Sequence, residues 1–215
     1  MPHLNLWKKR LGHLPESIWD QTDLESLVLA ENDLTEVPGR MGGLKRLRML
    51  DLGHNRLASL PDSLGDLESL TEFLYLHDNR LIDLPASLAR LTKLRYLNIS
   101  ENPLDTLPEC VCQMSGLVEL RACQNGFTGL PESIGRLSRL RELHLRDNKL
   151  SSIPESISGL VELRQIDLRG NPLAALPEAI RALPRIEKID LRWTPSLHLP
   201  EWAAELEARG CLVYK

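Results

Sequence analysis

Leucine and other aliphatic residues recur along this chain at fixed intervals. The spacing follows the template LxxLxLxxNxLxxLPxxIxxLxx, which returns every 23 residues over the whole sequence. Nine units begin at Met1, Leu24, Leu47, Thr71, Leu94, Leu117, Leu140, Leu163 and Ile186. A self-similar period of this length predicts a solenoid, in which each unit buries its apolar face against the next unit.

One unit is a residue longer than the template. It runs from Leu47 to Leu70, so the pattern slips by one position before Leu74 and Leu76 restore it. We expect the extra residue to form a local bulge between Leu70 and Phe73.

Each unit contains a predicted strand followed by a turn. The LxLxx part alternates with a period of two, which indicates a short strand with its leucines on the buried side. Asparagines recur at the turn, where their side chains can donate to and accept from backbone groups that would otherwise be unpaired. They are Asn32, Asn55, Asn79, Asn102, Asn125, Asn148 and Asn171. We expect a structural ladder here and not a binding site.

A proline follows the turn in every unit, and proline favours the first turn of a helix. The prolines are Pro15, Pro38, Pro61, Pro85, Pro108, Pro131, Pro154, Pro177 and Pro200. Segments such as PESIGRL then place apolar residues three apart, as Ile134 and Leu137 do, which predicts a short helical stretch. Because helices are wider than strands, the stack should bend, with helices on the convex side and a parallel sheet on the concave side. The concave side is the usual binding face of a solenoid.

Aromatic side chains gather at the outward-facing strand positions of units three to five. The whole chain has two phenylalanines and three tyrosines, yet Phe73, Tyr75 and Tyr96 all fall there. With Met49 and His77 they form what we call the aromatic patch, a candidate binding hot spot because rigid rings give large contact area at low entropic cost. An alternative is that strands simply favour aromatic residues and that the extra residue turns Phe73 inward.

Units six to nine place mainly charged residues on the same face. This charged zone comprises Glu119, Arg121, Glu142, His144, Arg146, Asp147, Asp167, Arg169, Lys188, Asp190 and Arg192. Its candidate contacts are Arg121, His144, Arg146, Arg169 and Arg192, because guanidinium groups bind carboxylates and phosphates through two parallel bonds. Equally, these charges can pair between strands on a solvated face, each pair contributing well under about 1 kcal/mol.

The recurring LPxxIxxLxxLxxLxLxxNxL resembles the leucine-rich repeat family over the whole chain. Its length is similar to the 23-residue intracellular subclass, which includes plant intracellular Ras-group-related proteins and many bacterial proteins. The resemblance implies an α/β fold, a right-handed horseshoe-shaped solenoid with a parallel β-sheet on the concave face and short helices on the convex face. It also implies that the protein binds another protein.

We expect a single domain whose two ends act as caps. Its parts are a degenerate N-terminal unit at 1–23, regular repeats at 24–185 and a C-terminal unit and cap at 186–215, making one domain over 1–215. Lys9 and Thr194 replace the ladder asparagine in the first and last units, as expected where a unit must face water on one side. The first unit is the weaker cap because its strand begins at Met1, which is consistent with a longer chain.

Beyond the last proline we expect a helix over residues 201–209, stopped at Gly210, and a final strand over 211–215. Trp19 and Trp202 are predicted to close the two ends of the core.

Composition and charge argue against several functional classes. The formal net charge of -4 gives no broad cationic field, so a generic nucleic-acid binder is not expected. No apolar run approaches the roughly 20 residues that span a bilayer, and the N-terminus lacks the apolar stretch of a secretory signal. The four cysteines are not clustered in pairs near the ends, as in an extracellular solenoid. We therefore predict a cytoplasmic monomer with no membrane contact and no cofactor.

Two groups of residues raise the question of a metal. Cys110 and Cys112 resemble half of a zinc site, but no second pair completes the four ligands, so we expect one buried residue beside one exposed neighbour. His54, His77 and Asp78 lie on adjacent rows, although a surface histidine pair is more often incidental. We predict no metal.

One group of residues raises the question of catalysis. Cys123, His144 and Asp167 come from consecutive strands in the order nucleophile, base and orienting acid. Cys123 lies two positions further along its strand than His144, which gives a separation of about 8 Å, long for a hydrogen bond. An open sheet also offers no amides for an oxyanion and does not exclude water.

The sequence therefore predicts a non-enzymatic signalling scaffold that holds a protein partner of unknown identity on its concave surface. Tyr75 and Tyr96 are the expected anchors, and the charged zone should set orientation and association rate. Two alternatives are a regulatory segment of a larger signalling enzyme, such as a kinase, GTPase or ubiquitin ligase, and a weak hydrolase that uses Cys123.

Overall fold

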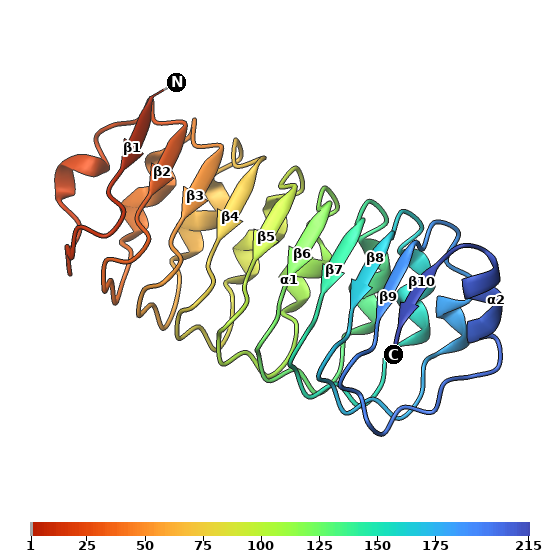
Figure 1. Ribbon diagram of the computed structural model, residues 1–215. Helices are drawn as coiled ribbons and strands as arrows, with labels where there is room; N and C mark the ends of the chain where they lie inside the picture. Colours follow the sequence, from red (N-terminus) through yellow and green to blue (C-terminus); the bar gives the residue numbers. More distant parts are fainter. Residues whose placement is uncertain (1) are drawn as a thin grey trace.

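Parallel strands in sequence order form one open sheet along the molecule. The computed structural model describes residues 2–215, and within them ten strands pair as neighbours from β1 to β10 without a crossover (Figure 1). The strands are β1 (His3–Asn5), β2 (Ser26–Val28), β3 (Met49–Asp51), β4 (Phe73–Tyr75), β5 (Tyr96–Asn98), β6 (Glu119–Arg121), β7 (Glu142–His144), β8 (Gln165–Asp167), β9 (Lys188–Asp190) and β10 (Leu212–Tyr214). From β2 to β8 the central residue is buried and its two neighbours are more accessible, as the alternating pattern predicts.

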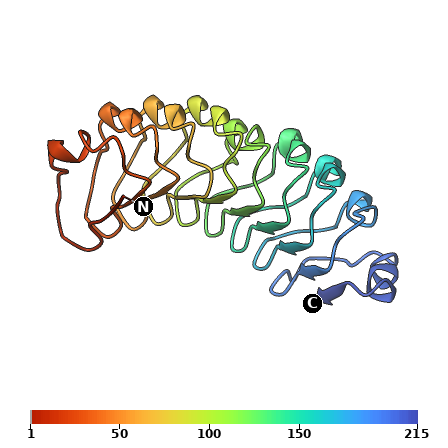
Figure 2. The ribbon, with the colours of Figure 1, turned by 90° about the horizontal axis from the view of Figure 1, so that it is seen from above.

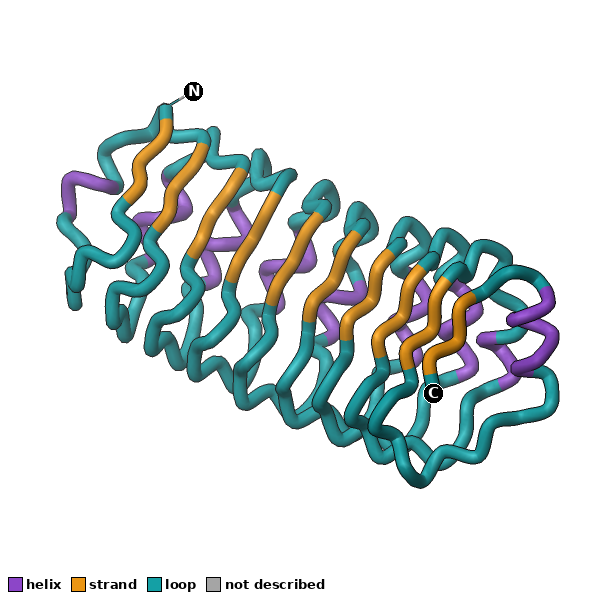
Figure 3. Tube along the Cα trace, in the orientation of Figure 1, coloured by secondary structure: helices purple, strands orange, loops and turns teal. Residues whose placement is uncertain are grey.

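A short helical segment follows each turn and lies opposite the sheet. The label η denotes a 3₁₀ helix. The segments are η1 (Glu16–Ile18), η2 (Gly39–Gly43), η3 (Asp62–Asp66), η4 (Ala86–Arg90), α1 (Glu109–Cys112), η5 (Glu132–Arg136), η6 (Glu155–Gly159), η7 (Glu178–Ile180) and α2 (Ala203–Ala208). Seen from above, they follow the outer side of an arc whose inner side carries the strands (Figure 2). The alternation of strand, loop and helix along the coil is plain in the trace (Figure 3). This is the α/β solenoid, with a concave sheet, that the sequence predicts.

Most of these segments are 3₁₀ helices because the chain must turn within about five residues after each proline. In η3, for example, the Leu64 amide donates to the Pro61 carbonyl at 3.0 Å, a bond between residues three apart. The apolar side chains of the segment then meet the leucines of the strands in one continuous aliphatic core.

The extra residue of the third unit lies just ahead of β4. In the regular repeat before it, the amides of Arg48 and Met49 both donate to one carbonyl, that of Glu25, at 2.8 and 3.2 Å. At the inserted position the amides of unit five instead use two successive carbonyls, those of Thr71 and Glu72. The bulge therefore falls where the leucine spacing placed it. It is absorbed before the strand begins, so Phe73 stays in register with its neighbours and is 40% exposed, not turned inward.

The asparagine ladder pairs backbone groups that the turns would otherwise leave unpaired. Asn102 shows the pattern that the buried rungs share, because its Oδ1 accepts the Leu81 amide at 3.0 Å. Its Nδ2 donates to the carbonyls of Leu76, Ile99 and Ser100, each at 3.1 Å. Each buried asparagine thus joins its own unit to the preceding one, which couples the coils along the molecule.

Asn125 is the weak member of the ladder. Its side chain is only partly buried, and its Nδ2 reaches the carbonyls of Ile99 and Cys123 at 3.3 and 3.1 Å. Its Oδ1 accepts the Asn102 amide at 3.2 Å. The bond that other rungs make to a carbonyl three residues earlier in their own unit is not among the hydrogen bonds of the described chain at this position.

The two ends differ in part from the expectation. Trp19 is buried and closes the first unit, and Trp202 packs, partly buried, against the core at the other end. The C-terminal helix α2 covers six residues and not nine, because residues 201 and 202 form a turn in which the Ala203 amide bonds to the Pro200 carbonyl. The final strand forms as β10 and pairs with β9.

Cys110 and Cys112 depart from the prediction as well. Both are buried, at 5% and 0% exposure, because α1 is an α-helix that turns both sulfurs toward the core. Burial raises the pKa of Cys110 to about 11 and also raises the pKa of Cys112, so both thiols stay neutral. In the described residues, no helix has both the length and the hydropathy that crossing a membrane would require.

Replacing Asn102 with alanine should lower the free energy of unfolding by about 2–4 kcal/mol, because several buried backbone groups lose their partners. Asn125→Ala is the matched control and should cost only about 1 kcal/mol, since that side chain is half-buried and makes fewer bonds. Urea denaturation followed by circular dichroism measures both values. Equal losses for the two variants would contradict the assignment of the ladder as the stabilising element.

Candidate functional site

The aromatic patch is a contiguous group of rings on the concave face. Strand register places Phe73 of β4 directly beside Met49 on one side and Tyr96 on the other. The Tyr75 and Tyr96 ring centroids are 5.0 Å apart, and Phe73 lies 5.5 Å from Tyr96 and 6.0 Å from Tyr75. These distances are in the range of favourable aromatic pairs. The patch is therefore preassembled, and its rings lose little freedom when a ligand covers them.

His77 extends the patch toward unit three. Its ring lies 6.1 Å from Tyr75 and 4.7 Å from His54, and it rests on the backbone of Gly53. A Cβ at Gly53 would come within 2.4 Å of the imidazole Cε1, so only glycine leaves room for this ring. Burial, together with the neighbouring His54, lowers the pKa of His77, which keeps the imidazole neutral and apolar in character.

The histidine pair does not assemble a metal site. Nδ1 of His54 is engaged by Oδ2 of Asp78 at 2.6 Å, while His77 is packed over Gly53. In the part of the chain that the structure describes, the one group of three potential ligands that converges is a different one, formed by Glu119, Glu142 and His144.

That second group is already occupied by protein contacts. Arg121 Nε donates to Glu119 Oε1 at 2.6 Å, and His144 Nε2 lies 3.2 Å from Glu142 Oε2. A cation would have to compete with the Arg121 guanidinium for Glu119, so the cluster is better described as an ion-pair network than as a metal centre.

The charged zone consists mainly of ion pairs within one repeat unit, and the pairs between strands are longer contacts, such as the 3.8 Å between His144 and Glu119. Arg169 binds Asp167 through two bonds of 2.9 and 2.6 Å, and Arg192 binds Asp190 through two bonds of 3.0 and 2.8 Å. The one contact between these rows, from Arg169 Nε to Asp190 Oδ2, measures 3.6 Å. Each arginine lies two residues after its carboxylate, just beyond the strand, and folds back over it, which fits the bidentate geometry better than a carboxylate of the next unit does. Arg146, in the same column, lies 3.2 Å from Asp147.

Asp190 is not on the accessible surface, contrary to the prediction. It is 2% exposed because Arg192 covers it and β10 pairs beside it. Burial acts to raise the pKa of Asp190, but hydrogen bonds from Arg192 and the charge of Arg169 outweigh burial and lower the pKa overall. The carboxylate is therefore a structural anchor for the arginines and not a ligand contact.

Two aromatic residues that the sequence analysis missed, Trp193 and Tyr214, lie beside the arginines at the C-terminal end of the charged zone. The guanidinium carbons of Arg169 and Arg192 lie 5.8 and 5.9 Å from the Trp193 ring, which is 67% exposed. Tyr214 of β10 faces Lys188 and Arg192, each at 5.4 Å. Trp193 escaped notice because it lies at the turn, with a left-handed φ of 61°, and not at an alternating strand position. The available signal was a large aromatic residue at a position where the other units carry glycine or a polar residue.

The residues of the hypothetical hydrolase do not form a catalytic relay. A cavity of about 280 Å³ lies on the concave face beside Cys123, His144 and Asp167. However, His144 is directed to Glu142 and Asp167 is held by Arg169. Burial also raises the pKa of Cys123, which disfavours the reactive thiolate.

Comparison with known proteins identifies the repeat. A family model described as leucine rich repeat matches residues 2–57, 22–81 and 115–173, and one described as leucine rich repeats in two copies matches residues 72–109. Among curated proteins, the volume-regulated anion channel subunit LRRC8A of Rattus norvegicus is 34% identical over 98 residues, which are 45% of this chain and 12% of that protein. Fibromodulin of Sus scrofa is 34% identical over 88 residues, 40% of this chain and 58% of its own length. The chain thus spans only part of the relatives that it matches.

Solved structures give the same result at the level of the fold. The leucine-rich repeat ectodomain of the plant membrane receptor kinase GASSHO1/SCHENGEN3 from Arabidopsis thaliana, in complex with CASPARIAN STRIP INTEGRITY FACTOR 2, is similar with a TM-score of 0.81 and 29% identity. That match covers 99% of this chain and 26% of the receptor chain. The plant peptide hormone receptor RGFR1 in complex with RGF2 has a TM-score of 0.69 at 22% identity, over 93% of this chain and 41% of that one.

The tyrosines of the patch should titrate late. Burial raises the pKa of Tyr96 from 10.0 to about 12, and it raises the pKa of Tyr75 as well. The folded state holds the Tyr96 proton more tightly than the unfolded state does. Tyr96 therefore contributes to the free energy of unfolding below about pH 10, and this contribution is lost as the pH rises through about 12. A tyrosinate absorbance titration should show a step near pH 12 that Tyr96→Phe removes and that denaturant moves to lower pH. An unchanged titration curve for Tyr96→Phe would show that Tyr96 is not buried in this way.

Proposed function

Because the chain belongs to the leucine-rich repeat family, we propose that it is a protein-binding scaffold that holds a polypeptide partner against its concave face and performs no catalysis itself. The aromatic patch carries this proposal. It joins Phe73, Tyr75 and Tyr96 in mutual contact on a rigid sheet, with Phe73 exposed and both tyrosines only partly buried.

The physical argument rests on preorganisation. A binding surface gains most affinity where large rings are already held in place, because less side-chain entropy is lost on association. Tyr75 and Tyr96 meet this condition, and their hydroxyls add a polar handle at the edge of an apolar surface. The two plant receptor structures are complexes with named ligands, which supports a binding role for this fold.

The charged zone has a different role in this proposal. Its arginines already satisfy carboxylates of the same strands, so breaking those pairs for a ligand would return little net affinity. The zone instead steers and orients the partner, which acts mainly on the association rate.

We further propose a reducing, cytoplasmic location and a monomeric state, as for the intracellular subclass that the 23-residue spacing resembles. Free cysteines support the location, since Cys110, Cys112 and Cys211 are buried thiols. A second candidate function is that of a regulatory segment within a longer signalling protein. The small share of the channel subunit, 12%, that this chain matches favours it.

The double variant Tyr75→Ala/Tyr96→Ala should weaken binding by about 100-fold or more, because hot-spot residues contribute about 2 kcal/mol each or more. The measurement is affinity capture with the wild-type chain, followed by titration calorimetry with each purified partner. Ile82→Ala/Val161→Ala is the matched control, since both residues are exposed hydrophobics outside the strands. Partners that survive the tyrosine double change, with a native circular dichroism spectrum, would refute the aromatic patch.

Neutralising Arg121 and Arg146 should slow association by less than about tenfold and leave dissociation nearly unchanged. Surface plasmon resonance of Arg121→Gln/Arg146→Gln at two salt concentrations measures both rates. The rate deficit should shrink as salt screens the charges. A variant that changed the dissociation rate instead would show that these arginines make direct contacts.

A further inference from the structure

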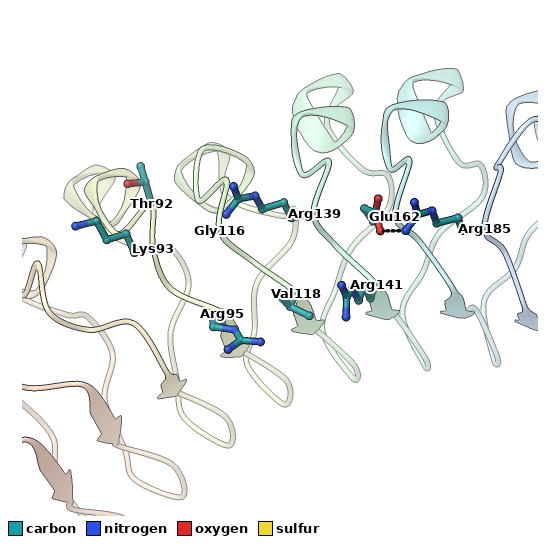
Figure 4. Close-up of a pocket in the computed structure, with 9 residues that line it drawn as sticks. All are labelled: Thr92, Lys93, Arg95, Gly116, Val118, Arg139, Arg141, Glu162 and Arg185. Carbon is teal, nitrogen blue, oxygen red and sulfur yellow. Dashed lines mark hydrogen bonds and ion pairs between the residues drawn. The ribbon is translucent and has the colours of Figure 1, made fainter. Parts of the chain in front are cut away.

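A depression lies on the side of the solenoid, where each convex segment leads into the next strand. We call it the basic hollow, and it has a volume of about 660 Å³. Its lining includes Lys93, Arg95, Gly116, Val118, Arg139 and Arg141, with the ion pair of Glu162 and Arg185 at one end (Figure 4). None of these residues belongs to the aromatic patch or the charged zone, so the hollow is a surface separate from the concave face.

The hollow exists because the junction of units five and six carries small residues at this edge. Gly116 and Val118 occupy the positions held by Lys93 and Arg95 in the unit before and by Arg139 and Arg141 in the unit after. A Cβ at Gly116 would come within 2.5 Å of the Thr92 carbonyl oxygen, so the coils approach closely here and the floor stays low. Long cationic side chains therefore flank a short, apolar floor.

Four of the five cations that line the hollow lack the partners found elsewhere on the same edge, while the fifth, Arg185, is paired with Glu162. Further along that edge in each direction, Arg48 pairs with Glu72 at 2.7 Å and Arg164 pairs with Glu187 at 2.8 Å. Among the ion pairs of residues 2–215, none involves Lys93, Arg95, Arg139 or Arg141.

Arginine side chains extend toward the floor from both sides, whereas the Lys93 side chain points away from it (Figure 4). Arg95 extends toward Val118, and Arg139 extends toward Gly116 (Figure 4). In a chain whose net charge is -4, four uncompensated cations in one recess form a local field of the opposite sign.

We propose that the basic hollow binds an acidic peptide segment of a partner protein. Arg95 and Arg139 receive its carboxylates, since guanidinium groups bind carboxylates through paired hydrogen bonds. Lys93 and Arg141 add attraction at longer range, and Val118 supplies an apolar contact for the segment's backbone or β-carbons.

A peptide fits this surface better than an anionic bilayer does. The cations face one another across a recess, whereas a bilayer is flat and favours cations that protrude together. Acidic residues also lie at the two ends of the recess. Glu72 lies beyond one end, and Glu162, which lines the other end, is neutralised by Arg185 at 2.5 Å. A membrane surface would be brought against these carboxylates as well, while a short peptide would not.

The test uses a fluorescein-labelled peptide of eight glutamates and fluorescence anisotropy on the full chain. The variant Arg95→Glu/Arg139→Glu should weaken binding by about tenfold or more, equivalent to about 1.4 kcal/mol or more. Arg80→Glu/Lys149→Glu is the matched control, because it reverses the same number of exposed charges beyond the opposite ends of the strands. This control should stay within about twofold of the wild type.

A second variant tests the floor without removing a cation. Val118→Glu places a carboxylate between the arginines and should weaken octaglutamate binding by about tenfold through like-charge repulsion. Both variants should keep the native circular dichroism spectrum and leave concave-face binding unchanged, which separates this proposal from the one above.

Three results would overturn the proposal. The wild-type chain could fail to bind octaglutamate, or the control could lose as much affinity as the double variant, which would indicate a general charge effect. Alternatively, vesicles of phosphatidylserine and phosphatidylcholine could bind with the same dependence on Arg95 and Arg139 while octaglutamate fails to compete, which would make the bilayer the occupant.

Discussion

Hydrogen bonds from buried asparagine side chains are the constraint on which the coil depends. Each unit must reverse direction immediately after a three-residue strand, and that turn leaves amide and carbonyl groups facing the core with no sheet partner. Asn102 resolves this for two units at once by accepting from Leu81 and donating to three carbonyls. The leucines supply the free energy of burial, but they can be stacked in this register only because the turns are paired. Because the asparagines hold the turns, the outward-facing strand positions are not needed for folding and can carry side chains that bind a partner.

The molecule therefore presents three surfaces with different side chains. The inner positions of the strands carry rings at one end and ion pairs at the other, while the side edge carries free cations around Gly116. All three surfaces are built on one aliphatic core, and none of them needs a change in the repeat itself. Binding chemistry and folding chemistry therefore occupy different positions of the same 23-residue unit.

The parts of the structure that follow from periodicity could be predicted from the sequence. The strand positions, the asparagine ladder and the bulge before Phe73 all follow from the spacing of leucine and asparagine residues along the sequence. The contacts of Asp190 could not be read in this way, because its burial depends on how Arg192 folds and on the pairing of β10. The same holds for Trp193, whose importance comes from two arginines on separate strands, and for the hollow at Gly116, which depends on its two neighbouring units together. The preference of Arg169 and Arg192 for a carboxylate of their own unit also depends on side-chain geometry, because the carboxylate two positions earlier lies closer than one on the neighbouring strand.

The half-exposed Asn125 has a mechanical consequence. In a solenoid each unit contacts only its neighbours, so stability depends on a series of interfaces between adjacent units. Unfolding is expected to begin at the least stable interface. Here the interface with the weakest asparagine rung, that of Asn125, lies near the border between the aromatic patch and the charged zone. Under tension or partial denaturation the molecule is thus expected to separate into two folding blocks, each keeping its own recognition surface intact after the other has melted.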